Sequence, residues 1–78
     1  MGFSVEVLDK NGQPVVNVSV RVLYDPNGQD NGYTNGDGIF DTKGSGGKLR
    51  QIDVSGSKAK TTGRTVGYND TVTVNLTY

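Results

Sequence analysis

Acidic and amide side chains are concentrated between residues 25 and 42, which hold four aspartates and three asparagines. Calcium takes oxygen ligands of this kind. The spacing does not fit an EF-hand loop, because counting from Asp25 places Asp30 where the loop needs glycine and Gly36 where it needs a bidentate glutamate. Ligands from separate turns can still converge, so the candidate metal ligands are Asp25, Asn27, Asp30 and Asp37. The alternative is that these side chains hydrogen-bond their own backbone in turns.

A second chemistry is suggested by tyrosines that lie next to asparagines. An exposed aromatic ring offers a flat apolar face to a sugar, and neighbouring amides can bond its hydroxyl groups. This pattern makes Tyr33, Asn35, Tyr68 and Asn69 the candidate ligand-binding residues. The chain has no tryptophan, and the alternative is that the tyrosines simply pack beside turns.

The chain contains few of the residue types that catalyse reactions. There is no histidine and no cysteine, which removes the commonest general base together with imidazole and thiolate metal ligands. The carboxylates fall in predicted turns or on outward strand faces, where no cleft would separate their pKa values. We therefore expect no catalytic residues, no enzymatic activity and no cofactor, with calcium as the open alternative.

The charges cancel overall but are unevenly placed. Residues 1–42 hold two basic and six acidic side chains, and residues 43–78 hold six basic and two acidic ones. Strands from the two halves that lie side by side would mix these charges. The alternative is a basic face for an anionic polymer, formed by Lys48, Arg50, Lys58, Lys60 and Arg64. No aromatic residue is interleaved with these five, so we expect no nucleic-acid partner.

Alternating valines are the strongest structural pattern. Apolar and polar residues take turns in residues 3–9, 15–25 and 70–78, and shorter or weaker strands are expected around 33–34, 39–40, 49–56 and 57–67. Six or seven strands separated by turns predict an all-β, seven-stranded Greek-key β-sandwich. In residues 15–25, Val16 is expected to share the inward face with the valines that follow it. The predicted core is Val5, Val7, Val18, Val20, Val22, Phe40, Ile52, Val54, Val72, Val74 and Leu76.

Two motifs interrupt the alternation of apolar and polar residues. The first, VLDKNGQPVVNVSVRV, contains Asp9, Gly12, Pro14 and Val15 between two strands, and the second, TNGDGIF, runs from residue 34 to 40. Gly12 and Gly38 are predicted to supply positive backbone φ angles at the turns. The two motifs resemble those of carboxypeptidase regulatory-like domains, which have a transthyretin-like (prealbumin-like) sandwich related to the Ig-like folds.

The resemblance implies more than the residue pattern does. It implies a single domain over residues 1–78 that serves as a non-catalytic structural or adhesive module, a spacer or interaction domain of a secreted or cell-surface protein. The expected location is extracellular or in the cell envelope, although MGFSVEV lacks the features of a signal peptide. The expected partners are protein or carbohydrate, without membrane insertion, and the chain is expected to be a monomer or part of a larger multidomain chain.

Overall fold

The computed structural model describes residues 2–43, 47–67 and 69–77. Within these residues the chain forms eight strands and no helix, so no helix there could cross a membrane. The strands are β1 Ser4–Leu8, β2 Ser19–Tyr24, β3 Gln29–Tyr33, β4 Ile39–Asp41, β5 Gly47–Val54, β6 Ser57–Thr61, β7 Thr65–Val66 and β8 Thr71–Asn75. The additional strand relative to the predicted seven is the two-residue β7, which pairs with the start of β5.

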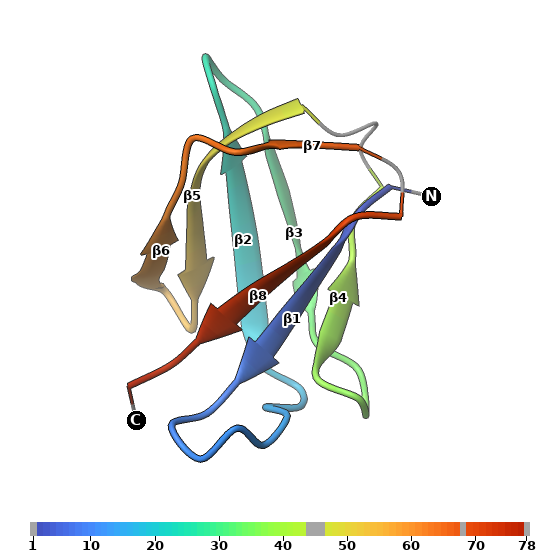
Figure 1. The fold of residues 1–78 in the computed structure, drawn as a ribbon, viewed down its shortest axis with the longest axis vertical. Coiled ribbons are helices and arrows are strands. Elements are labelled where there is room, and N and C mark those ends of the chain that lie inside the picture. Colours follow the sequence, from blue (N-terminus) through green and yellow to red (C-terminus); the bar gives the residue numbers. More distant parts are fainter. Residues whose placement is uncertain (1, 44–46, 68, 78) are drawn as a thin grey trace.

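The strands form two sheets (Figure 1). One sheet has the order β4-β1-β8, and the other has the order β3-β2-β5-β6 with β7 also paired to β5. The first and last strands, β1 and β8, are parallel neighbours, whereas the other strand pairs are antiparallel. The first and last strands of the chain therefore lie side by side in the smaller sheet.

One apolar core lies between the two sheets, as expected for a sandwich-like all-β arrangement. It joins valines of β1 and β8 from one sheet to β2 and β5 residues from the other. Nine of the eleven predicted core residues are buried; the other two, Val18 and Phe40, are half-buried and pack against the core. The core also includes Phe3, Leu49 and Val66, which were not in the predicted set.

The predicted strand over residues 15–25 is shorter in the structure. Asn17 has a φ of 56°, in the left-handed region that asparagine tolerates better than most residues. This turn ends the alternation, so β2 begins only at Ser19 and Val16 is 46% exposed. The expectation that Val16 shares the inward face of the strand was therefore wrong.

The strands on either side of the second motif lie in different sheets. β3 pairs with β2, whereas β4 pairs with β1. The intervening residues therefore carry the chain from one sheet to the other rather than closing a hairpin. Figure 1 shows this crossing at the end of the molecule opposite the β2–β3 turn.

Candidate functional site

The two sequence motifs meet at one end of the molecule. Val7 of β1 donates its N–H to the carbonyl of Gly38 at 2.9 Å and accepts a hydrogen bond from the N–H of Val15 at the same distance. Gly38 has a φ of 75°, and a Cβ atom added to it would lie 2.7 Å from the Cβ of Pro14. The glycine of the second motif is thus required both by its backbone angle and by its contact with the proline of the first.

Each motif contains one side chain that organises its own loop. The Oδ1 atoms of Asp9 and Asn35 each accept hydrogen bonds from the backbone N–H groups two and four residues further along the chain. The distances are 2.8 and 3.0 Å for Asp9 and 2.8 and 3.1 Å for Asn35. These are the local side-chain-to-backbone bonds that favour aspartate and asparagine in turns.

Thr34 connects the motifs through its hydroxyl group. Its Oγ1 donates to the carbonyl of Val15 at 2.7 Å and accepts the N–H of Val18 at 3.1 Å. The residue is 2% exposed, so both backbone groups are satisfied away from solvent. Thr42 does the same for both backbone groups of Phe3. In the described part of the chain, no buried side-chain nitrogen or oxygen lacks a partner.

The structure separates Asp37 from the other three candidate calcium ligands. Asp25 and Asn27 lie in the β2–β3 turn, and Asp37 lies beyond the opposite end of β3. Asp25 forms an ion pair with Lys48 at 3.7 Å, and Asp30 accepts a hydrogen bond from a tyrosine. Across residues 2–43, 47–67 and 69–77, acidic side chains do not gather in a group of three that could hold a metal ion.

Asp30 is part of an internal contact around Tyr24. The Tyr24 hydroxyl donates to Oδ2 of Asp30 at 2.6 Å, and the Tyr24 ring meets Phe3 edge to face at a centroid distance of 6.3 Å. Burial of the ring, together with the hydrogen bond and the negative charge of Asp30, raises the pKa of Tyr24 well above its usual value. The carboxylate is therefore engaged in holding a half-buried aromatic residue.

The candidate carbohydrate residues do not form one platform. Tyr33 is 70% exposed on the outer face of the larger sheet, while Asn35 uses its Oδ1 within its own loop. Asn69 instead lines a cavity of about 460 Å³ at the end of β1 and β4, together with Ser4, Asp41 and three further residues. Tyr68 lies outside the described residues. Tyr33 therefore presents a ring that a ligand could reach.

A polar cluster that the sequence reasoning missed lies on the outer face of the larger sheet. Arg21 of β2 and Asp53 of β5 are directly paired across the strands. The guanidinium donates from Nε at 3.2 Å and Nη2 at 2.7 Å to Oδ2 of Asp53, and Gln51 Nε2 donates to Oδ1 at 2.6 Å. Burial alone raises the pKa of Asp53, but the hydrogen bonds from Arg21 and Gln51 outweigh it and lower this pKa below its usual value. Only the strand register could reveal this pair.

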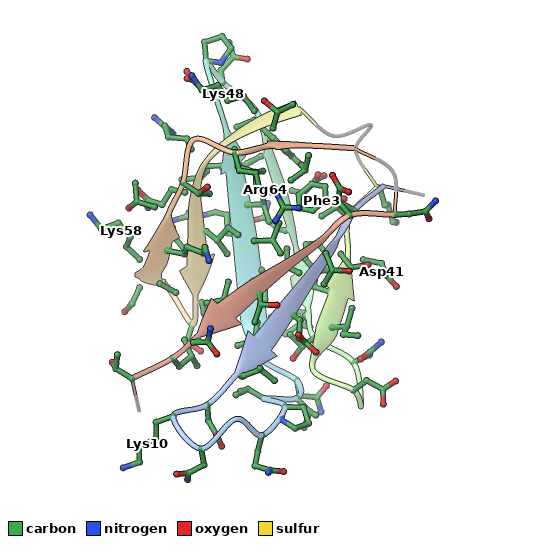
Figure 2. The ribbon with its side chains drawn as sticks, viewed as in Figure 1. Phe3, Lys10, Asp41, Lys48, Lys58 and Arg64 are labelled. Atoms are coloured by element: carbon green, nitrogen blue, oxygen red, sulfur yellow. The ribbon has the colours of Figure 1, made fainter. Side chains whose placement is uncertain are left out.

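The five basic residues do not form a single cluster. Figure 2 shows Lys48, Lys58 and Arg64 apart from one another. Lys48 pairs with Asp25, while Lys60 Nζ donates to the carbonyl of Thr73 at 3.0 Å and Arg64 Nη1 to that of Thr71 at 3.5 Å. Three of the five cations are therefore held in separate intramolecular contacts.

No protein-family model and no curated protein matches this sequence.

Proposed function

We propose that the chain is a non-catalytic structural or adhesive β-sandwich module, acting as a spacer or interaction domain of a secreted or cell-surface protein. In this proposal the two sheets form a transthyretin-like, Ig-like Greek-key sandwich and the chain is one carboxypeptidase regulatory-like domain. The resemblance of the two motifs supports the family and the extracellular location.

One observation carries the structural role. One polar side chain of the first motif and two of the second bond to nearby backbone: Asp9 and Asn35 cap their own loops, and Thr34 ties the second motif to Val15 and Val18. In a ligand site such oxygens would face solvent or a cavity. In a motif that supports the fold they instead accept hydrogen bonds from the protein itself. The motif residues therefore support the connection between the sheets.

A substitution at Thr34 tests this role. Thr34→Val keeps the shape of the side chain but leaves the part-buried N–H of Val18 without its acceptor, so we expect a loss of about 1–3 kcal/mol in the free energy of unfolding. The control is Thr61→Val at an exposed position of β6, expected to stay within about 0.5 kcal/mol of the parent. Urea denaturation measures both. Equal stability of the two variants would contradict a structural role for the motif.

Calcium binding is tested by melting the protein with and without millimolar calcium. Because Asp25, Asp30 and Asp37 are spread over both ends of β3, we expect no change in the melting temperature. A folded-state site filled at one hundred times its Kd would add about 2.7 kcal/mol. Such an increase, abolished in Asp30→Asn, would replace the structural proposal with a calcium-binding one.

Carbohydrate binding is the second candidate, favoured by the 70% exposure of Tyr33 beside the exposed Asn31 of the same strand. A ring stacked on a sugar changes its fluorescence, so glycans that bind would be detected by titration of tyrosine emission. Tyr33→Ala should abolish that response. A response that persists in this variant would place the glycan elsewhere on the molecule.

A further inference from the structure

The edges of the two sheets are not equally protected against pairing with another strand. The edge strands are β4 and β8 in the smaller sheet, and β3 and β6 in the main path of the larger one. An edge exposes unpaired backbone N–H and C=O groups, and proteins protect it with short strands, lysines, bulges or covering side chains. A poorly protected edge is therefore a candidate contact surface.

Three of the edges carry such protection. β4 has only three residues, and β6 contains Lys58 and Lys60 and pairs with β5 through a register shift. The outward carbonyls of β8 at Thr71 and Thr73 accept hydrogen bonds from the side chains of Arg64 and Lys60. An incoming strand would have to displace these two cations.

β3 presents its outer backbone groups without such protection. The N–H of Thr34 donates to Val18 and the N–H of Tyr24 donates to Gly28, which sets the phase of the β2–β3 ladder. Since bonded and non-bonded pairs alternate in an antiparallel ladder, Asp30 and Gly32 bond to β2, while residues 29, 31 and 33 direct their N–H and C=O groups away from it. These outward groups form no hydrogen bond within the described part of the chain.

The side chains of the outward residues also favour a strand partner. Gln29, Asn31 and Tyr33 are exposed and uncharged, and β3 contains neither proline nor lysine. The pairing of β3 with β2 runs without a register shift, so the edge is regular. A second strand would meet no charged side chain on this face of β3.

We propose that β3 pairs antiparallel with β3 of a second copy of the chain, about a twofold axis at Asn31. In this register Asn31 faces its own counterpart and Gln29 faces Tyr33, and each pair can exchange both backbone hydrogen bonds. On the other face, Asp30 lies opposite Gly32, which has no side chain, so like charges are not directly opposed. The five-residue strand is thus complementary to itself.

The interface is small. A single pair of short strands buries less than the roughly 1,200–2,000 Å² of a stable specific interface. The expected dimer is therefore weak and reversible, formed at millimolar protein concentration and lost on dilution. This differs from the monomer expected from the sequence, and it does not depend on the proposed role as a spacer or adhesive module.

Sedimentation velocity and backbone amide NMR over a dilution series from millimolar to micromolar protein test the proposal. We expect the sedimentation coefficient to fall on dilution and the amide shifts of residues 29, 31 and 33 to move together. Asn31→Pro should abolish both changes, because it removes only an outward N–H and leaves the bonds to β2 in place. Asn31→Ala is the matched control, which retains the N–H and should dimerise as the parent does.

Two results would overturn the proposal. One is a parent protein whose sedimentation and amide shifts do not depend on concentration; the other is a dimer that survives in Asn31→Pro or whose shifts map to β6 or β8. If Asn31→Pro fails to fold, Tyr33→Lys, which adds the protecting charge found on other edges, replaces it with Tyr33→Gln as its control. Persistent dimerisation of Tyr33→Lys would then count against pairing through β3.

Discussion

Replacement of Gly38 by alanine tests how the two motifs hold the fold together, and Gly12 provides a matched control within the same chain. Both glycines have left-handed backbones, with φ of 75° at Gly38 and 81° at Gly12. A Cβ on Gly12 would have nothing within 4 Å, whereas one on Gly38 would lie 2.7 Å from Cβ of Pro14 and 3.1 Å from the N of Val15. The two substitutions therefore share the backbone strain and differ in the contact.

The expected loss of stability in each variant follows from the backbone strain and, for Gly38, from the contact with Pro14. An L-residue in the left-handed region costs about 1–2 kcal/mol, and the reduced freedom of the unfolded chain returns about 0.4–1 kcal/mol. Gly12→Ala should therefore lower the free energy of unfolding by roughly 1 kcal/mol. Gly38→Ala should lose a further 1–3 kcal/mol or so through overpacking, about 2–4 kcal/mol in total. The corresponding falls in melting temperature are about 5 °C and about 10–25 °C.

Thermal and urea denaturation monitored by circular dichroism measure both variants against the parent. The difference between the two variants isolates the contact of Gly38 with the first motif, because the backbone strain is common to both. If Gly38→Ala were no less stable than Gly12→Ala, the contact with Pro14 would not support the fold. The account of the two motifs as one structural junction would then be refuted.

The remaining predictions concern titrating groups. The folded-state pKa of Asp53 lies below the unfolded value of about 3.9, so the ionised carboxylate stabilises the fold. This contribution to the free energy of unfolding is complete above the unfolded pKa and is lost as the pH falls through the folded-state pKa. Urea denaturation between neutral and strongly acidic pH should therefore show a steeper acid loss of stability in the parent than in Asp53→Asn, and equal slopes would contradict the cluster with Arg21. Tyr24 has the opposite sign: its raised pKa makes its contribution complete below the unfolded value of about 10 and lost as the pH rises through the folded pKa. Tyrosinate absorbance should show a step above the usual range of tyrosine, and Asp30→Asn should bring that step to lower pH; an unchanged step would exclude the bond between Tyr24 and Asp30.

The sequence by itself determined the local properties of the chain. The alternation of Val20 and Val22 with polar neighbours identified a strand with one buried face, because side chains of a strand alternate between its two faces. Gly12 and Gly38 were assigned positive φ angles because few other residues adopt them readily, and both have them. The absence of histidine and cysteine likewise restricts the available chemistry, whatever the fold.

Only the tertiary structure decided which residues meet. Asp25, Asn27 and Asp37 are close in sequence, but the extended β3 lies between them, with Asp25 and Asn27 before the strand and Asp37 after it. Arg21 and Asp53 are far apart in sequence, yet the β2–β5 register places them side by side. Periodicity reports the face on which a side chain lies, but not the strand it pairs with, because pairing depends on long-range packing of the whole core. The parallel contact of β1 with β8 and the open edge of β3 follow from that packing alone.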